Sequence, residues 1–258
     1  MKKYTVLSAL AFTCLTMKAA ELDGVRYGGY TTNAVPAGFS IVAVPFSGVD
    51  TNSSSFSVTN LSLEALISTN GLALGDRLIA FNEATTNYYY YTLTSTGWDS
   101  VEVANIGTGS TNFVKIVSGV PLSTVTKAQG YAFWLKSTNV ATTVYLQGVV
   151  NTNASVAVAA GPSFTLVGNA LPTALNLNSE SFTNNTWFFA GYPGRGDEIH
   201  VATTNGKYIK NVYYGGGWKK IEYTTSNTVY SAASDPIPAG SGMWYLRRGT
   251  SAQTLVIK

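Results

Sequence analysis

Residues able to carry acid–base or metal chemistry are few in this chain. His200 is the only histidine and Cys14 the only cysteine among 258 residues. A Ser-His-Asp triad would have to use His200, but no G-x-S-x-G sequence accompanies it. A typical zinc site needs several His or Cys ligands. We therefore predict no catalytic residues, no metal and no cofactor, and we interpret His200 as an ordinary strand residue.

Two pairs of carboxylates recur in matching sequence contexts. Asp76 and Asp197 each follow a glycine, and Glu102 and Glu222 each follow a Gly-Trp pair at the same spacing. Glycoside hydrolysis needs two carboxyl groups within about 5–10 Å of each other. Equivalent places in two copies of a unit predict separation, so we interpret both aspartates as turn residues. Calcium binding near Asp197 and Glu198 is a lesser alternative, because calcium needs several oxygen ligands.

Aromatic side chains are the best candidates for binding. Tyrosines are concentrated in two predicted hairpins, and alternation along a strand places half of each run on either face. One half is expected in the core. The other half is a candidate platform for sugars or another subunit, since tyrosine combines apolar area with a polar tip. The candidate ligand-binding residues are Tyr89, Tyr91, Tyr213, Tyr214 and Trp218.

An internal repeat organises most of the chain. Four landmarks occur twice in the same order, and two of them combine glycine with tryptophan. They begin at Gly38, Gly75, Gly97 and Gly130 in the first copy, and at Gly161, Gly196, Gly217 and Gly240 in the second. The recurrence of Trp98 with Trp218, and of Trp134 with Trp244, favours core positions. The first copy carries an extra segment, for which Thr108 to Lys115 is the candidate.

The pattern of each copy predicts strands and little helix. Short apolar runs bounded by turn residues are typical of buried strands, and an aromatic hairpin with a glycine turn follows in each copy. Leu61 to Ile67 is expected to form a helical turn capped by Asn60. The last predicted strand pair is 131–136 with 142–146, matched by 243–247 with 253–257. The predicted fold is all-β, with two tandem, internally repeated units, each a small β-sandwich or partly open barrel.

The N-terminus has the pattern of an export signal. Lys2 and Lys3 precede the apolar stretch from Val6 to Leu15, and small residues follow. The predicted divisions are a signal peptide at 1–20, an arm at 21–36, the first unit at 37–148, a link at 149–159 and the second unit at 160–258. The expected location is extracellular, at the cell surface or periplasmic.

Composition excludes some classes of protein. Three of the 16 basic residues lie in the predicted signal, which leaves 13 basic and 13 acidic side chains and gives no case for nucleic-acid binding. No later segment is long and apolar enough to predict a transmembrane helix. The single cysteine leaves with the signal, so packing and strand pairing must stabilise the fold.

The order of landmarks resembles a β module found in tandem in secreted and surface proteins of environmental bacteria. The first copy matches it at 38–45, Gly75-Asp76, Gly97-Trp98 and 133–135. The second has Pro238, Gly240 and Trp244 but Gly168 in place of the proline that ends the first strand. These modules are mostly uncharacterised, so the resemblance implies location and architecture but no activity.

These observations favour a non-enzymatic envelope or extracellular protein with a structural or adhesive role. Its partner would be a second copy of itself or an extracellular glycan. The alternative is a carbohydrate-binding module that uses surface tyrosine and tryptophan.

Overall fold

The structure is a computed structural model that describes residues 28–49, 58–82, 87–100, 116–117, 119–138, 141–150, 154–183, 186–203, 207–224 and 227–257. The predicted export signal, Cys14, Glu102 and the extra segment from Thr108 to Lys115 lie outside these residues. The part described is all-β, with sheets that are almost entirely antiparallel. In it, the sheets stay open and no closed barrel forms, and no helix is long and apolar enough to cross a membrane.

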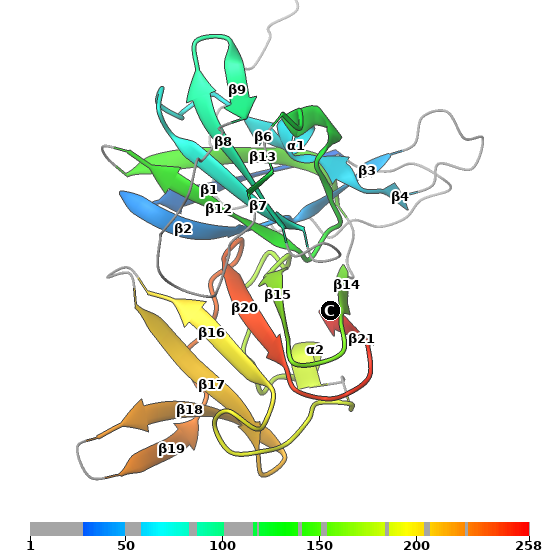
Figure 1. Cartoon of the computed structure of the whole chain (residues 1–258), viewed down its shortest axis with the longest axis vertical. Helices are drawn as coiled ribbons and strands as arrows, with labels where there is room; N and C mark the ends of the chain where they lie inside the picture. Colours follow the sequence, from blue (N-terminus) through cyan, green and yellow to red (C-terminus); the bar gives the residue numbers. More distant parts are fainter. Residues whose placement is uncertain are drawn as a thin grey trace, which may run out of the picture.

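The first half of the chain forms two main sheets, drawn in the upper part of Figure 1. One has the order β10-β8-β7-β12-β2, with β9 paired to β8, and its strands are β2 (Gly38–Ala43), β7 (Arg77–Asn82), β8 (Asn87–Thr94), β9 (Gly97–Ser100), β10 (Ile116–Val117) and β12 (Ala132–Ser137). The other has the order β1-β13-β3-β4, with β6 paired to β13, and its strands are β1 (Gly28–Val35), β3 (Phe46–Val49), β4 (Val58–Thr59), β6 (Ile67–Ser68) and β13 (Thr142–Val150). Smaller elements are β5 (Leu61–Ser62), α1 (Leu63–Leu66), η1 (Leu122–Thr124) and β11 (Thr126–Lys127).

The core of this half lies between its two sheets. Strand β12 contributes Phe133 and Leu135 from one sheet, and β13 contributes Val144 and Leu146 from the other; all four are fully buried. Their spacing of two residues is the alternation that a strand imposes. The apolar positions of these strands therefore explain why the two sheets face each other.

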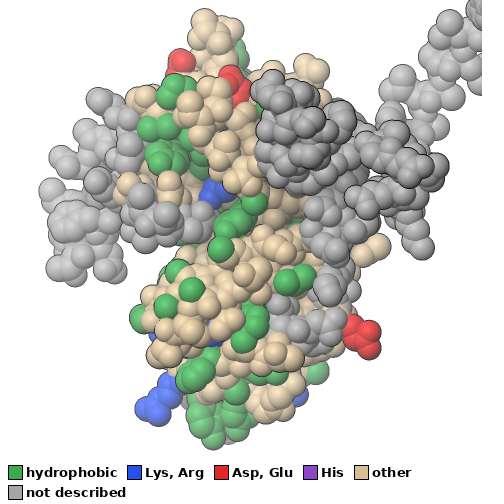
Figure 2. Space-filling view, turned by 90° about the vertical axis from the view of Figure 1, so that its right-hand side faces the viewer, with side chains coloured by type: hydrophobic (Ala, Val, Ile, Leu, Met, Phe, Trp, Pro, Cys, Tyr) green, Lys and Arg blue, Asp and Glu red, His purple; other side chains and the backbone are tan. Residues whose placement is uncertain are grey.

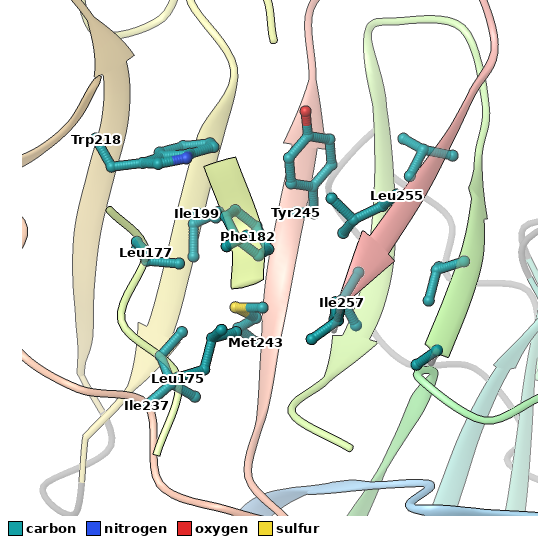
Figure 3. Close-up of a cluster of buried hydrophobic side chains, with 14 of the residues drawn as sticks. Leu175, Leu177, Phe182, Ile199, Trp218, Ile237, Met243, Tyr245, Leu255 and Ile257 are labelled. Atoms are coloured by element: carbon teal, nitrogen blue, oxygen red, sulfur yellow. The ribbon is translucent and has the colours of Figure 1, made fainter. Parts of the chain in front are cut away.

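The second half has one large sheet covered by a strand pair, in the lower part of Figure 1. The large sheet has the order β15-β20-β16-β17-β18-β19, with bounds β15 (Ser163–Gly168), β16 (Glu198–Ala202), β17 (Tyr208–Tyr214), β18 (Gly217–Tyr223), β19 (Thr228–Ala232) and β20 (Gly242–Arg247). The covering pair is β14 (Ala154–Val158) with β21 (Gln253–Ile257), and α2 (Glu180–Thr183) lies beside it. Figure 3 shows the core between these layers, where Trp218, Phe182 and Tyr245 are fully buried.

Several local expectations differ from the structure. Ser62, not Asn60, caps α1, because its Oγ accepts a hydrogen bond from the Ala65 N–H at 3.2 Å. The last two strands of each half do not pair with each other. Strand β12 pairs with β2 and β7 while β13 pairs with β1, and β20 and β21 are separated in the same way. The predicted arm contains β1, and the predicted link contains β14.

A third, smaller apolar cluster lies between the two halves. It contains Ile41 and Ala132 from the first half and Leu166 from the second, with Trp134 and Trp244 packed against it. The two tryptophan rings meet edge to face, with centroids 5.0 Å apart. These tryptophans were expected in separate cores. They lie instead on the sheet faces that point away from the cores and join the two halves.

We predict that Gly242→Ala destabilises the protein. A Cβ at this position would lie 2.2 Å from Ile41 Cγ2 and 2.8 Å from the Ala132 Cβ, across the junction. Overpacking of this kind costs about 1–3 kcal/mol, which urea denaturation can measure. Gly217→Ala is the control, because its Cβ would come no closer than 3.3 Å, to the side-chain oxygen of Asn178. Equal losses for the two variants would contradict the close junction.

Candidate functional site

A tight hairpin sets which tyrosines of the second half reach the surface. Gly215 and Gly216 connect β17 to β18 with φ of +63° and +81°, the left-handed values that a two-residue type I′ turn requires. The pairing that results places Tyr213 opposite Trp218 and Tyr214 opposite Gly217. Tyr213 packs against the core, and Tyr214 therefore points to the opposite, outward face.

The loop Gly191 to Gly196 brings a second tyrosine beside Tyr214. The Gly191 N–H donates to the Tyr213 carbonyl at 3.0 Å, which fixes the loop to β17. Its two ends touch so closely that a Cβ on Gly191 would lie 2.6 Å from the Gly196 nitrogen. Glycine at both ends thus closes a compact turn, and Tyr192 stands out from it with 57% of its surface exposed.

Three tyrosine rings form a continuous strip on this outward face. The centroids of Tyr192 and Tyr214 are 5.0 Å apart, and those of Tyr214 and Tyr230, on β19, are 5.6 Å apart. Successive rings are tilted by 33° and 34°. A side-chain hydrogen bond with Tyr192 is the main cause that raises the pKa of Tyr214. We call Tyr192, Tyr214 and Tyr230 the tyrosine strip.

Charged side chains also occur on the sheet that carries the strip. Figure 2 shows a different face of the molecule, the right-hand side of Figure 1, on which charged side chains are sparse over the described residues. Lys220 and Asp235 form an ion pair at 2.9 Å, and Lys220 also lies 3.4 Å from Glu222. By alternation along β18, Lys220 lies on the face of Trp218, whereas Lys219 lies on the outward face that carries the strip. The strip therefore shares its face with a lysine.

Tyr89 lies in a different setting, at a pocket of the first half. The pocket has a volume of about 330 Å³, near the lower end for small-molecule sites. The Tyr89 hydroxyl accepts a hydrogen bond from the Asn82 side chain at 3.1 Å. The buried Lys127 ammonium donates to the Phe81 carbonyl and lies 5.3 Å from the Tyr131 ring centroid. Aromatic and polar groups thus line the same cavity.

Three of the predicted binding residues belong to the cores. Tyr91 is 1% exposed, and its hydroxyl donates to the Val120 carbonyl at 2.9 Å. Burial is the main cause that raises its pKa. Trp218 is fully buried, and Tyr213 packs on it with ring centroids 5.5 Å apart. Of the five, only Tyr214 points outward, whereas Tyr89 packs against the core of the first half and lines its pocket.

The outward half of the first tyrosine run is Tyr88 and Tyr90. Tyr88 stacks on Trp134 at 5.9 Å, and the Tyr90 hydroxyl accepts from Arg77 at 3.3 Å. We expected the tyrosines to alternate between the two faces of the sheet and took Tyr89 and Tyr91 as the binding half. In the structure, these two are the inward half. Sequence reasoning also missed Tyr192 and Tyr230. For Tyr192, the signal was its place between the glycines of a short loop.

Asp76 and Asp197 act as anchors inside their own halves. Both are fully buried. Asp76 accepts hydrogen bonds from the Ala73 N–H and the Thr138 N–H, both at 2.9 Å. Asp197 accepts from the backbone N–H of Phe189 at 3.0 Å and of Arg248 at 2.7 Å. The two carboxylates therefore each tie a preceding loop to the end of a strand.

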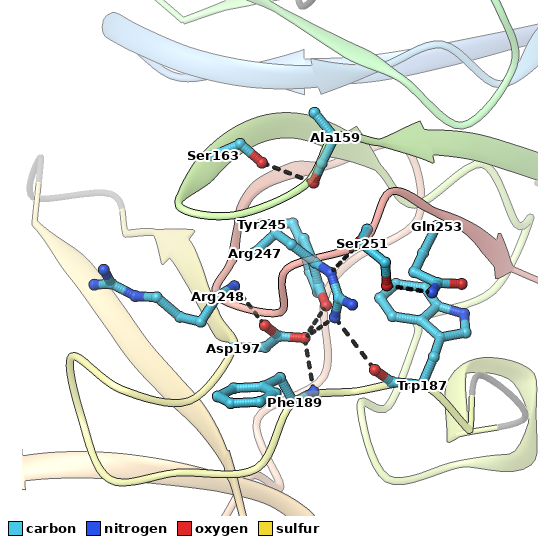
Figure 4. A network of polar contacts seen from close by, with 10 residues as sticks. All are labelled: Ala159, Ser163, Trp187, Phe189, Asp197, Tyr245, Arg247, Arg248, Ser251 and Gln253. Atoms are coloured by element: carbon cyan, nitrogen blue, oxygen red, sulfur yellow. Dashed lines mark hydrogen bonds and ion pairs between the residues drawn. The ribbon is translucent and has the colours of Figure 1, made fainter.

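Asp197 also binds two side chains, as Figure 4 shows. The Tyr245 hydroxyl donates to it at 2.6 Å, and Arg247 forms an ion pair with it at 2.8 Å. The Arg247 guanidinium also donates to the Trp187 carbonyl and lies 4.7 Å from the centre of the Trp187 ring. This carboxylate is the centre of a buried polar network.

His200 pairs with Glu198 on β16. Their side chains meet at 2.8 Å, and the Glu198 carboxylate accepts a further hydrogen bond from the Gly194 N–H at 2.6 Å. Burial alone would raise the pKa of Glu198. Hydrogen bonds from His200 and Gly194, with the charges of His200 and Arg248, outweigh it and lower that pKa below its ordinary value of 4.5.

The described residues contain no group of three or more His, Cys, Asp or Glu side chains placed to hold a metal ion. Comparison of the chain with protein-family models, with curated proteins and with solved structures finds no match.

We predict that Asp197→Asn lowers the free energy of unfolding by about 3–5 kcal/mol, because it leaves the buried Arg247 without its counter-charge. Asp76→Asn is the matched control. Asp76 is equally buried, but its hydrogen bonds come from uncharged groups, so we expect a smaller loss of about 1–3 kcal/mol. Chemical denaturation of both variants measures the difference, and equal losses would show that the ion pair adds nothing.

The lowered pKa of Glu198 predicts acid-dependent stability. The ionised carboxylate stabilises the folded state fully above its ordinary pKa of 4.5, and this contribution is lost as pH falls through the lower folded value. The free-energy difference between wild type and Glu198→Gln should therefore be largest above pH 4.5 and shrink in more acidic solution. Glu222→Gln, at an exposed site, is the control. A difference that stays constant into acid would contradict the prediction.

Proposed function

We propose that this chain is an exported, non-enzymatic adhesive protein that binds extracellular carbohydrate through the tyrosine strip. The observation that carries the proposal is the row of three touching tyrosine rings on an outward sheet face. Tyrosine offers an apolar face for the C–H groups of a sugar and a hydroxyl for its polar groups.

The framework of the strip supports this function. Tyr214 lies at the end of a strand, Tyr192 in a loop closed by backbone contacts and Tyr230 on β19, which pairs with β18 along its whole length. Rings held on such supports lose little conformational freedom on binding, which favours affinity.

We also propose that the chain arose by duplication of one sandwich-like unit. The order β2-β12-β7-β8-β9 corresponds to β15-β20-β16-β17-β18. The registers correspond as well, since Trp134 lies opposite Ile79 and Trp244 opposite His200. Ile41 opposite Trp134 and Leu166 opposite Trp244 align Ile41 with Leu166. This alignment pairs Gly38 with Ser163, whereas the sequence landmarks paired Gly38 with Gly161. The first landmark therefore moves by two residues.

A structural role through self-association is a second candidate, favoured by strand β19. It forms the edge of its sheet, and its residues Thr228–Ala232 include no charge and no proline. Such an edge lacks the usual protection against pairing with another chain. Light scattering that shows mass rising with concentration, abolished by Val229→Lys, would support this role.

We predict that Tyr214→Ala weakens glycan binding about tenfold or more, because it removes the central ring of the strip. A glycan array identifies the ligand, and titration calorimetry measures the affinity. Tyr223→Ala is the control, since Tyr223 is 65% exposed but makes no ring contact with the strip among the described residues. Full binding by Tyr214→Ala, or an array without any bound glycan, would overturn the proposal.

A further inference from the structure

The contacts between the two halves occur in reciprocal pairs. The Ala43 N–H donates to the Gly240 carbonyl at 2.8 Å, and the Gly168 N–H donates to the Gly130 carbonyl at 2.7 Å. In the proposed alignment, Ala43 corresponds to Gly168 and Gly130 to Gly240. The second hydrogen bond is therefore the first with the two halves exchanged.

The β-bridges between the halves follow the same rule. One joins Val42 to Ser241, and the other joins Tyr131 to Val167. Val42 corresponds to Val167, and Tyr131 to Ser241. Again, exchanging the halves converts one contact into the other. Trp134 and Trp244, which also correspond, contact each other directly.

Outside these central contacts, the aromatic neighbours also correspond. Phe81 packs against Trp244 with ring centroids 5.6 Å apart, and its counterpart, Ala202, belongs to the same apolar cluster as Trp134. Burial is the main cause that raises the pKa of Tyr88, and its counterpart Tyr208 lies close enough to raise it further. A one-sided contact is the hydrogen bond from the Asn33 side chain to the Gly240 carbonyl at 3.0 Å.

From these pairs we infer that the two halves are docked about a pseudo-two-fold axis, through corresponding surfaces that fit each other. A two-fold interface has this property: residue i contacts j, and j contacts i. The inference rests on the proposed duplication and is independent of glycan binding. The partner of each surface is a second copy of the same unit, supplied here by the same chain.

Small residues allow the two faces to approach at the axis. A Cβ on Gly168 would lie 2.5 Å from the Ala43 Cβ, and a Cβ on Gly242 would lie 2.8 Å from the Ala132 Cβ. Each of these close approaches joins corresponding residues, with alanine in the first half and glycine in the second. The two faces therefore complement each other at the axis, because the first half supplies the methyl groups and the second half leaves room for them.

The experiment frees one face at a time in the full chain. Ile41→Arg with Trp134→Arg introduces charge into the docking face of the first half, at positions that point away from its core. The face of the second half is then unoccupied. We expect it to bind the same face of another chain, so that the mass measured by analytical ultracentrifugation doubles relative to wild type.

The matched variants complete the test. Leu166→Arg with Trp244→Arg frees the first-half face, where a second copy would place the methyl groups of Ala43 and Ala132 as close to their own copies as the 2.5 Å and 2.8 Å given above. This variant should therefore keep the wild-type mass alone and double it when mixed with the first variant, and all four changes together should keep the wild-type mass. Gly242→Arg provides a second route to undocking if a double variant loses its far-UV circular dichroism. If the mixture of the two folded two-change variants keeps the wild-type mass, or if the four-change variant still associates, the inference is overturned. Glycan binding through Tyr214 should be unaffected throughout, which separates this failure from failure of the proposed function.

Discussion

The structure of each half depends on one buried carboxylate. Asp197 receives hydrogen bonds from a loop, from the residue after β20, from Tyr245 and from Arg247. A buried charge is tolerated only when its surroundings are organised around it. The same carboxylate therefore fixes the loop before β16, and this loop carries Tyr192. Asp76 ties its loop to the end of β12 with fewer bonds and without a buried arginine.

Alternation then distributes the aromatic residues among three environments. Trp218 and Tyr245 point inward and fill a core. Trp134 and Trp244 point outward near the junction and bury each other. Farther along the same outward face, no described part of the other half covers the tyrosine strip. One strand geometry thus produces core, junction and exposed surface, according to how much of the outward face the other half covers.

Much of the architecture could be predicted from the sequence, because it depends on local patterns. The apolar runs, the glycine turns and the hairpins were located from residue types alone. The face to which each tyrosine of Tyr88 to Tyr91 points could not be predicted, because an unbroken aromatic run has no polar residue to mark its outward face. The position of Trp134 and Trp244 between the two halves was also not predicted. A residue buried between two halves and one buried in a core have the same sequence signature.

In the duplication that we propose, the tyrosine strip marks a place where one copy differs from the other. The docking contacts and the buried carboxylates constrain both halves, since a change there costs stability. The turn end of the hairpin is free of these constraints. In the first half, Thr94 holds the position that corresponds to Tyr214, and its hydroxyl donates to the Gly97 carbonyl at 2.9 Å. The first half therefore lacks the central ring of the strip. If the chain binds a sugar on this face, the second half provides the site, and the first half supports it through the junction.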